Sequence, residues 1–467
     1  MIFQNYDEII HFSSSIRQKA RETVLRLFDI GVNAVNPSKI INENLIYNSE
    51  RKKLIIKDQV FSVKERKIYI IGAGKAVGRM AEALEKLLID LEFQGIICVP
   101  QGMKTHLTLN KLECLESTHP LPSEVNLVNT KEILDLIENI EPNDLVIALI
   151  SGGGSAIWTA PISPITIEDL IFLNKKLIES GMDIHEMNVV RKHVSKIKGG
   201  KVAKIISAEM IVLILSDVIG DNLETIASGC FHPDPSTFLD AKYLLHQYGL
   251  MNVIPDSVKL VIERGNDGSI PETPKKGASF FQNVHTYVLG SNKLACNAIM
   301  TNAKKLGLNT LFLTDKIEGD AKWLGQLLAR IYQGLADGTH APLLVVSGGE
   351  PTVKVRGRGI GGRNQEVAAA VLQEFFSLAS PPDIVFLSAG TDGVDGNSPY
   401  AGALVDDLSV IENQKKMLDL AKYREENNLS KFFEKLGGSV LMSGPTGTNV
   451  MDLQIALLNA SIFESRG

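Results

Sequence analysis

Short apolar runs alternate with longer amphipathic segments along most of the chain. The apolar runs of the first half are residues 67–71, 95–99, 144–150 and 210–215. Helical spacing of apolar residues is found at 76–88, 124–139, 166–180 and 188–207. Continuous apolar runs are typical of parallel strands that are buried on both faces. Strands that alternate with helices predict an α/β fold with a doubly wound parallel sheet.

The second half repeats this alternation and adds a hairpin. Its apolar runs are residues 286–289, 309–314, 343–346 and 384–388. Polar and apolar residues alternate at 352–356, which predicts a half-exposed strand. We expect this strand to pair with the run at 343–346 and to make the second sheet mixed.

A stretch rich in proline, lysine and glycine at 271–283 marks the expected domain boundary. We therefore predict two three-layer α/β/α domains, an N-terminal Rossmann-like domain with a parallel sheet at 1–275 and a C-terminal domain with a mixed sheet at 276–467. Ligands of open α/β sheets bind beyond the carboxyl ends of the strands. We therefore expect the active site in the cleft between the two domains.

Residues 10–36 show helical periodicity. Their apolar face consists of Ile16, Ala20, Val24, Leu27, Ile30 and Ala34. Asn36-Pro37 is expected to end this helix. The stripe predicts a packing helix that is free to pack on the second domain.

Composition narrows the classes of function. Apolar residues make up 44% and charged residues 22% of the chain, as in soluble globular proteins. The net charge of -6 argues against a nucleic-acid or acidic-membrane binder, and no apolar run reaches the ~18 residues of a membrane span. We see no secretory signal. The four cysteines lack zinc-site spacing, so we expect free thiols and a cytoplasmic protein.

The densest candidate chemistry lies at residues 347–366, SGGEPTVKVRGRGIGGRNQE. Glycines let backbone N–H groups approach a ligand, and the helix expected after them offers its N-terminus to an anion. Arg358 and Arg363 can each present a planar fork to a phosphate or carboxylate. Asn364 is the expected helix cap, with Glu366 in the first turn. The alternative is a solvated hairpin with a flexible tip.

Glycine-rich or aspartate-bearing turns follow the apolar strands repeatedly. They are GAGKA (72–76), SGGGSA (151–156), SDVIGDN (216–222), SGGE (347–350), GTDGVDG (390–396) and SGPTGTN (443–449). Such turns predict a cleft that handles phosphate. The first turn lacks dinucleotide-fingerprint and P-loop spacing, and no acidic residue ends the second strand. Lys75 lies in this turn and can reach into the cleft.

Three sets of groups are candidate ligand contacts. Successive N–H groups at 151–155 form a nest for an anion. Arg191, Ser195 and Lys198 have spacings that put them on one helix face, where they could hold a carboxylate or phosphate; a solvated basic face is the alternative. Carboxylates at strand ends suit Mg²⁺, so Asp217 and Asp221 are metal or base candidates. Turn chemistry explains the aspartates at 390–396 nearly as well.

In this order the motifs resemble the glycerate 2-kinase family of the bacterial class II type, whose C-terminal half carries the MOFRL domain. The resemblance runs from about residue 12 to 457. It rests on GAGKA, HPLPSE, ISGGGSA, NVVRKHVSKIKGGKVA, SDVIGDN, SGGEPTVKVRG, GGRNQE, GTDGVDG and SGPTGTN with Asp452. The resemblance implies phosphorylation of glycerate by ATP with Mg²⁺, a key lysine at Lys75 and a key arginine at Arg363.

Combining the resemblance with the residues, we expect D-glycerate and ATP as substrates and 2-phosphoglycerate as the product. Catalysis is assigned to Lys75, Arg363 and Asp217. Substrate contacts are assigned to Arg191, Ser195, Lys198, Ser151, Gly152 and Gly153. Nucleotide contacts are assigned to Gly74, Gly154, Ser155, Gly348, Gly349, Glu350, Asn364 and Asp392. Mg²⁺ is assigned to Asp217 and Asp221.

Two other functions remain open. Relatives named hydroxypyruvate reductase make an NAD(P)H-dependent reductase the main alternative, and a non-catalytic nucleotide or sugar-acid binder is the third. The missing ribose-binding acid argues against the reductase. A homodimer is left open, and no nucleic-acid or membrane partner is expected.

Overall fold

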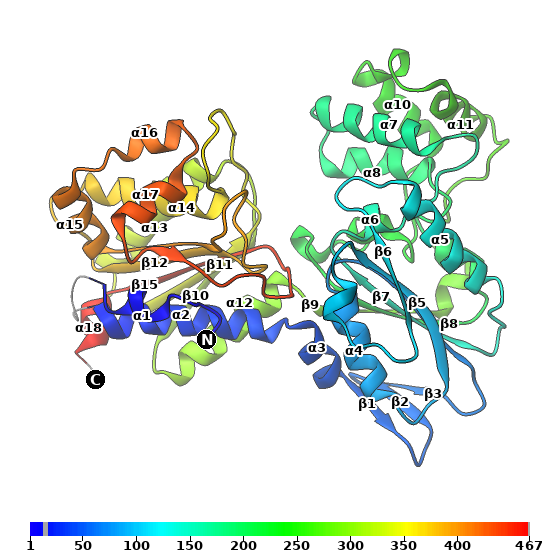
Figure 1. The fold of residues 1–467 in the computed structure, drawn as a ribbon, viewed down its shortest axis with the longest axis horizontal. Helices are drawn as coiled ribbons and strands as arrows, with labels where there is room; N and C mark the ends of the chain where they lie inside the picture. Colours follow the sequence, from blue (N-terminus) through cyan, green and yellow to red (C-terminus); the bar gives the residue numbers. More distant parts are fainter. Residues whose placement is uncertain (13–16, 466–467) are drawn as a thin grey trace. The chain divides into compact units, whose positions relative to one another are not determined.

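The computed structural model describes residues 1–12 and 17–465 (Figure 1). Contacts group the chain into two compact units. The parallel-sheet unit is Pro37–Leu289, and the mixed-sheet unit joins Met1–Asn36 to Gly290–Gly467. The chain thus passes between units at 289/290, where the sequence suggested 275/276. Residues 13–16 of the predicted helix 10–36, Ile16 among them, lie outside the described residues.

The parallel-sheet unit is built on a six-stranded sheet. Its strand order is β6 (Glu113–Ser117), β5 (Phe93–Pro100), β4 (Ile68–Ala73), β7 (Leu145–Ser151), β8 (Glu209–Leu215) and β9 (Val284–Gly290). The strands from β6 to β8 pair in parallel. Strands β4 and β7 are buried along their whole length, as expected of central strands with both faces covered.

Helices cover both faces of this sheet. On one face, α4 (Val77–Leu87) packs against β5 and β7. On the other face, α5 (Glu124–Ile137) and α9 (Lys201–Ile205) pack with alternate residues of β4. A further helical cluster consists of α7 (Ile167–Glu179), α8 (Ile184–His193), α10 (Phe238–Gln247) and α11 (Asp256–Asn266). Helix α3 (Pro37–Asn44) and the antiparallel strands β1 (Leu45–Asn48), β2 (Lys53–Ile56) and β3 (Gln59–Ser62) complete the unit.

The predicted continuous helix at 188–207 is wrong. Helix α8 ends at His193 and α9 begins at Lys201. Between them Gly199 and Gly200 have φ values of +61° and +80°, a left-handed conformation that interrupts a right-handed helix. Arg191 therefore lies on α8, while Ser195 and Lys198 belong to the turn after it.

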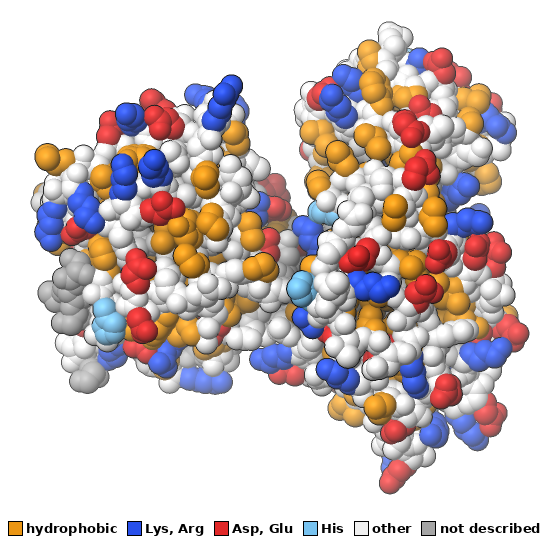
Figure 2. Space-filling view, viewed as in Figure 1, with side chains coloured by type: hydrophobic (Ala, Val, Ile, Leu, Met, Phe, Trp, Pro, Cys, Tyr) orange, Lys and Arg blue, Asp and Glu red, His pale blue; other side chains and the backbone are white. Residues whose placement is uncertain are grey.

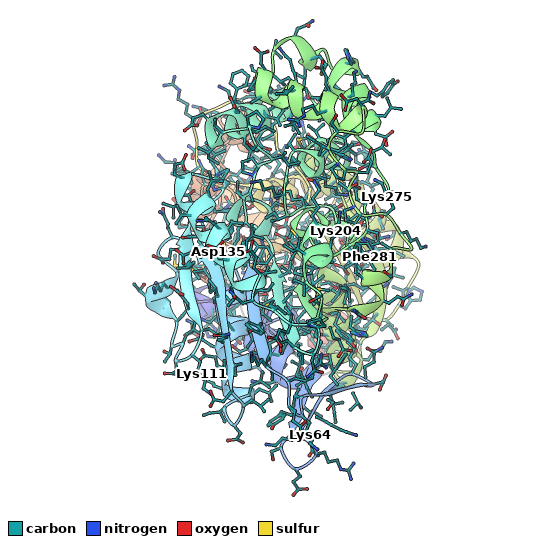
Figure 3. All side chains as sticks on the ribbon, turned by 90° about the vertical axis from the view of Figure 1, so that its right-hand side faces the viewer. Lys64, Lys111, Asp135, Lys204, Lys275 and Phe281 are labelled. Atoms are coloured by element: carbon teal, nitrogen blue, oxygen red, sulfur yellow. The ribbon has the colours of Figure 1, made fainter. Side chains whose placement is uncertain are left out.

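Strand β9 also differs from the expectation, because it joins the sheet of the first half rather than that of the second. The segment before it contains the short helix η6 (Ser279–Asn283), which packs beside α9. Figure 3 labels Lys204 and Phe281 in this region. By taking the place next to β8, β9 covers backbone groups that an edge strand would leave unpaired.

The mixed-sheet unit contains a second six-stranded sheet. Its order is β10 (Asn309–Ile317), β11 (Leu343–Gly349), β15 (Asp452–Leu458), β12 (Ile384–Gly390), β13 (Gly402–Val405) and β14 (Val440–Leu441). Only β10 and β11 pair in parallel, and the other pairs are antiparallel. The prediction of a mixed sheet is confirmed.

The predicted hairpin at 345–356 is nevertheless wrong. Residues 352–356, all of them described, form no strand, and Thr352 makes only an isolated bridge to Asp320. The antiparallel partner of β11 is β15 instead. A strand from the end of the chain can supply the pairing that local alternation suggested, because sheet propensity depends on tertiary context.

Helices also cover both faces of the mixed sheet. One face carries the core of α13 (Ala321–Asp337), α14 (Arg363–Phe376) and α17 (Leu429–Leu436). The other face carries α12 (Asn292–Lys305) and α2 (Gln18–Ala34), which also pack against each other. The remaining helices are α1 (Tyr6–Ile10), α15 (Asp407–Lys416), α16 (Leu420–Glu425) and α18 (Ala460–Glu464). Both units thus have the predicted three-layer α/β/α arrangement.

The surface of each unit mixes charges of both signs over the face seen in Figure 2. None of the helices in the described part of the chain is long and apolar enough to cross a membrane. All four cysteines are buried and free, which confirms the prediction of free thiols.

Candidate functional site

Two glycine turns of the parallel-sheet unit are bonded to each other. The turn after β4 donates the Lys75 N–H to the Gly152 carbonyl at 2.9 Å, and the Ala76 N–H to Ser151 Oγ at 3.0 Å. Gly74 has a φ of +148°, and a Cβ there would overlap with Ser151. Ser151 is itself buried. The buried hydroxyl therefore holds the start of α4, and the close approach explains why this turn needs glycine.

Lys75, His119 and Asp217 meet around the second of these turns. A Cβ at Gly152 would overlap with the Asp217 carboxylate. A Cβ at Gly153 would lie 3.1 Å from His119 Nε2 and 3.3 Å from Lys75 Cγ. The predicted lysine and aspartate thus follow the ends of β4 and β8, the two strands that flank β7, at the sheet edge where ligands of such folds bind.

Burial and a nearby charge shift the pKa values of Asp217 and His119. Burial raises the pKa of Asp217, and the nearby Lys75 ammonium partly opposes that rise. Burial lowers the pKa of His119, and Lys75 lowers it further. Lys75 itself is exposed. A carboxylate with a raised pKa is a better proton acceptor near neutral pH than an ordinary aspartate, and the neutral imidazole can accept or donate a hydrogen bond.

A cavity of about 230 Å³ opens beside these turns within the parallel-sheet unit. Its polar lining includes His119, Ser155, Asn174, Arg191, Ser195 and Lys198. Arg191 Nε donates to Asn174 Oδ1 at 2.8 Å, and none of the carboxylates in the described ranges forms an ion pair with this guanidinium. Lys198 Nζ donates to the Ser155 carbonyl at 2.6 Å. The cavity therefore presents two cations without a paired anion.

The chemistry of Lys198 follows from its burial. The side chain is 7% exposed, and burial lowers the pKa of its ammonium to about 8. Arg191 lowers that pKa further, because a second cation disfavours the protonated form. An anion bound in the cavity would relieve both the desolvation and the repulsion.

The structure brings Arg191, Ser195 and Lys198 together, although the predicted reason for it is wrong. Ser195 Oγ accepts the N–H groups of Ile197 and Lys198 at 3.2 and 3.3 Å, so it shapes the turn after α8. The three residues line the cavity through that turn and not through a shared helix face. Asn174, which orients Arg191, gave no signal in the sequence because it lies on a different helix, α7.

The other predicted contacts of this unit are spread along the same turns. Gly154 begins the short helix α6 (Gly154–Ile157), where a Cβ would lie 3.1 Å from the Ala73 carbonyl. Ser155 Oγ lies 2.8 Å from Ser228 Oγ. Asp221 has a φ of +55° at the end of the short helix η3 (Ile219–Asp221). Groups of three or more side chains suited to hold a metal ion are absent from the described residues.

In the mixed-sheet unit, Arg363 is held between two carboxylates. Its Nε and Nη2 donate to the two oxygens of Asp452 at 2.5 and 3.1 Å, and Nη1 pairs with Glu350 at 2.9 Å. Asp452 is fully buried, whereas the Glu350 side chain is 44% exposed. The buried pair fixes the direction of the guanidinium, and the exposed Glu350 is the partner that a bound anion could replace.

Several predicted nucleotide contacts have packing roles. A Cβ at Gly348 would overlap with the Asn292 amide, and one at Gly349 with the backbone of Ile317. Asn364 is fully buried and accepts from Ser388 Oγ at 2.7 Å. The prediction that Asn364 caps α14 is wrong, because the N-cap is Gly362. The Asn364 N–H, and that of the next residue, instead donate to Asp395 at 2.9 Å each.

The glycine-rich loop at 354–362 is not an open nest. The N–H groups of Arg356 and Gly357 donate to Asn427 Oδ1, and that of Gly359 donates to the Glu426 carbonyl at 3.0 Å. The N–H of Gly361 donates to Asn397 Oδ1 at 2.9 Å. The glycines permit close packing on residues 426–428, so these N–H groups are already satisfied.

The two units together define a two-domain α/β protein whose parallel sheet presents cations and a carboxylate at the carboxyl ends of its strands. Residues 23–263 match the family model described as a domain of unknown function, DUF4147, and residues 343–452 match the MOFRL family. The chain belongs to the glycerate kinase family, which combines these two domains.

Three relatives illustrate the match. A protein from Pyrococcus horikoshii named glycerate 2-kinase is 38% identical over 95% of this chain and 99% of the relative. A crystal structure of glycerate kinase from Thermotoga maritima has a TM-score of 0.81 at 31% identity, covering 94% of this chain and 100% of that one. A protein from Agrobacterium vitis, provisionally named hydroxypyruvate reductase, is 33% identical over 94% of each chain.

Proposed function

We propose that this protein transfers the γ-phosphoryl group of ATP to D-glycerate and forms 2-phosphoglycerate. The observation that carries the proposal is the cavity in which Arg191 and Lys198 face no carboxylate of the described residues, beside the turn that brings Lys75 and Asp217 together. A small hydroxy acid supplies the missing anion. Relatives named glycerate kinase, which match nearly the whole chain, support the choice of substrate.

In this proposal the glycerate carboxylate lies against Arg191. A guanidinium gives a carboxylate orientation as well as charge, because it donates two parallel hydrogen bonds. Asn174 holds the Arg191 side chain in place through Nε. Lys198 and the hydroxyl of Ser195 contact the remaining oxygens, and the N–H groups of residues 151–153 line the approach of the phosphoryl group.

The reaction requires one bond to form and one to break. The 2-hydroxyl oxygen of glycerate attacks the γ-phosphorus, and the bond from that phosphorus to the β,γ-bridging oxygen breaks, releasing ADP. The hydroxyl proton passes to Asp217, whose raised pKa suits a proton acceptor. Lys75 and Arg363 neutralise the charge on the transferred group.

Mg²⁺ fits the carboxylates of this proposal. Mg²⁺ usually takes one or two protein carboxylates together with substrate phosphates, so a site with fewer than three protein ligands is in keeping with an ion that arrives with the nucleotide. Asp221 would hold it, which leaves Asp217 at the end of β8 as the proton acceptor. When bound, Mg²⁺ supplies positive charge to the phosphate oxygens.

The test is phosphorus NMR of the protein with Mg·ATP and D-glycerate. We expect ADP and a product signal coupled to the single C2 proton. In Lys75→Ala the rate should fall about 10²- to 10³-fold, as on loss of a group that stabilises transition-state charge. Lys64→Ala, at a lysine whose side chain is 72% exposed (Figure 3), is the matched control. Full turnover in folded Lys75→Ala would remove the central claim.

Reduction of hydroxypyruvate is the second candidate, because one relative carries that name. Its substrate also has a carboxylate that Arg191 could bind. Loss of NADH absorbance with hydroxypyruvate, and no ADP formed from ATP and glycerate, would establish the reductase in place of the kinase.

A further inference from the structure

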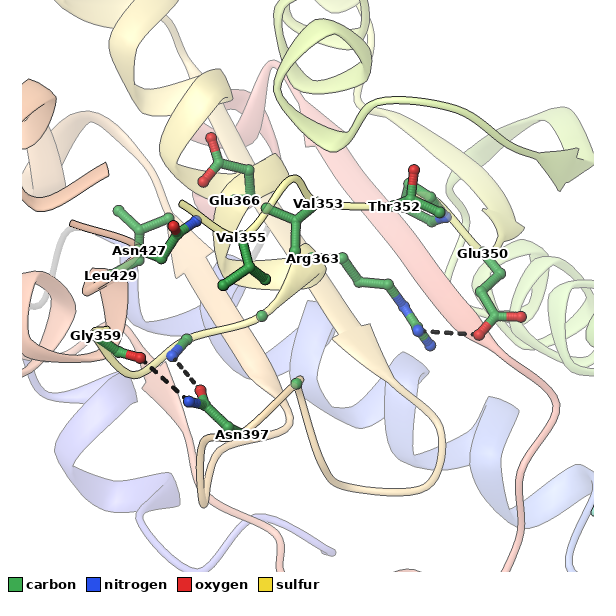
Figure 4. A pocket seen from close by; sticks show the side chains of 14 residues that line it. Glu350, Thr352, Val353, Val355, Gly359, Arg363, Glu366, Asn397, Asn427 and Leu429 are labelled. Atoms are coloured by element: carbon green, nitrogen blue, oxygen red, sulfur yellow. Dashed lines mark hydrogen bonds and ion pairs between the residues drawn. The ribbon is translucent and has the colours of Figure 1, made fainter. Parts of the chain in front are cut away.

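The mixed-sheet unit has a cavity of about 510 Å³ (Figure 4), larger than the cavity around Arg191. Figure 4 shows Arg363 and Glu350 at one end of it and Asn427 with Leu429 at the other. Val353 and Val355 lie between these ends. The cavity is therefore elongated, with a cation at one end and the apolar side chains of Val353, Val355 and Leu429 along part of its wall.

The wall of this cavity is held in place before any ligand binds. Asn427 accepts two N–H groups of the loop at 354–362 through Oδ1 and donates to the Lys354 carbonyl at 3.2 Å through Nδ2. Asn397 accepts from Gly361 and donates to the Gly359 carbonyl at 3.1 Å, as the dashed lines in Figure 4 show. A preorganised wall loses little entropy on binding, which favours affinity.

The apolar part of the cavity includes an exposed aliphatic side chain. The Val355 side chain is 74% exposed, although it sits on a loop that hydrogen bonds hold at both sides. Val353, Pro351 and Leu429 extend the same surface. Flat, apolar ligand groups bind between such aliphatic side chains, with a few polar groups to fix their orientation.

The charges around the cavity favour an anionic ligand. Lys354, Arg356 and Arg358 are exposed on the clamped loop, and no ion pair joins these three side chains to any of the residues the structure describes. Glu366, which lines the cavity, is neutralised by Arg424 at 2.7 Å. Its carboxylate can still accept hydrogen bonds from sugar hydroxyls.

We propose that this cavity binds the base and ribose of the nucleotide, with the base against Val353, Val355 and Leu429 and the phosphates directed to Arg363. The inference rests on the proposed kinase function, since it assumes that Arg363 acts on the γ-phosphoryl group. It differs from the sequence-based assignment, which placed nucleotide contacts on the strand-end residues Gly348 and Gly349. The phosphates would take the place of Glu350 on the guanidinium.

The experiment is Val355→Asp, which adds an anion to the apolar wall at an exposed position. The dissociation constant of a fluorescent ADP analogue and the KM for ATP should each rise at least about tenfold. The KM for glycerate at saturating ATP should stay within twofold. Ile411→Asp makes the same change on α15 of the same unit, at a position 38% exposed, and should alter none of these constants.

A second measurement is independent of turnover. Because all four natural cysteines are buried, a Val355→Cys variant carries one accessible thiol. Bound ADP should slow the alkylation of this thiol by a maleimide at least fivefold. Unchanged ADP affinity in Val355→Asp and unprotected alkylation would overturn the nucleotide cavity while leaving kinase activity standing. Binding and protection by ADP without phosphorylation of glycerate would keep the cavity and reject the kinase.

Discussion

At the scale of single residues, the cations of the proposed site differ in what neutralises them. Arg363 is bound to Asp452 and Glu350, while Arg191 and Lys198 meet only an amide and a carbonyl oxygen. Buried cations without anions carry a desolvation cost. A site that keeps such groups is poised to bind an anion, because the ligand offsets a cost that already exists.

This reasoning predicts how substrate binding depends on pH. The pKa of Lys198 is about 8 in the folded protein, against an ordinary value of 10.5. Above pH 8 the folded protein loses this charge, so the KM for glycerate should rise by up to about tenfold per pH unit until other groups titrate. Steady-state kinetics between pH 7 and pH 9.5 measure this dependence of the KM on pH.

Lys198→Met is the matched control, since it removes the charge at every pH. Its KM should be about 10- to 150-fold higher at pH 7, as expected for a lost charged hydrogen bond, and flat up to pH 9.5. The stability of the native protein should rise between pH 8 and 10.5, because only the unfolded chain still holds the proton there. A flat KM in the native protein would contradict the assignment.

At the scale of elements, α14 shows how a distant turn completes a helix end. Its N-cap is Gly362, which has no side chain to bond the first N–H groups. Asp395, from the turn after β12, accepts two of them. Burial raises the pKa of Asp395 to about 7, an effect that these N–H groups partly oppose. Because Arg363 is the first residue of α14, Asp395 helps to position its guanidinium.

We predict that Asp395→Ala loosens the first turn of α14. Loss of a cap typically costs about 0.5–2 kcal/mol, and kcat should fall together with protection of the Asn364 and Gln365 amides from hydrogen exchange. Asp419→Ala removes the cap of α16 in the same unit, where Asp419 accepts the Lys422 N–H at 3.1 Å. That variant should deprotect α16 and leave kcat unchanged. Equal protection of α14 in both variants would refute the positioning role.

At the scale of the whole molecule, the start of the chain completes the unit formed by its end. Arg21 of α2 and Asp406 before α15 are both fully buried and joined by two hydrogen bonds. Arg21 also donates to the Ile9 carbonyl at 2.8 Å. Removing one member of a buried ion pair leaves an uncompensated charge. The mixed-sheet unit therefore depends on residues that lie far from its sheet in the sequence.

Arg21→Ala should destabilise the mixed-sheet unit by about 3–5 kcal/mol. Calorimetry should show its unfolding transition shifted to lower temperature, with the transition of the parallel-sheet unit unchanged. The control is Arg26→Ala on the same helix, where Arg26 and Glu22 form an ion pair at the surface. It should cost less than about 1 kcal/mol. A similar shift in both variants would show that the buried pair has no special role.

Periodicity and turn chemistry predicted most strands of the parallel sheet because both are local. Strands β4, β7 and β8 coincide with apolar runs of the sequence. The turn carrying Lys75 comes directly after β4, as the glycine spacing indicated. The predictions of a hairpin at 345–356 and of a helix across Gly199 and Gly200 failed for another reason. The choice of β15 as a partner, and the left-handed glycines, depend on contacts that neighbouring residues do not reveal.

The sequence by itself determined the α/β class, the alternation of strands and helices, and the turns at which cations and carboxylates collect, since side-chain polarity and backbone preference act over a few residues. Only the tertiary structure decided which groups are free to bind. Arg363 is paired because β15 brings Asp452 to it, and the loop N–H groups are used because residues 426–428 pack on them. Arg191 has no anionic partner among the described residues because packing brings it the Asn174 amide instead.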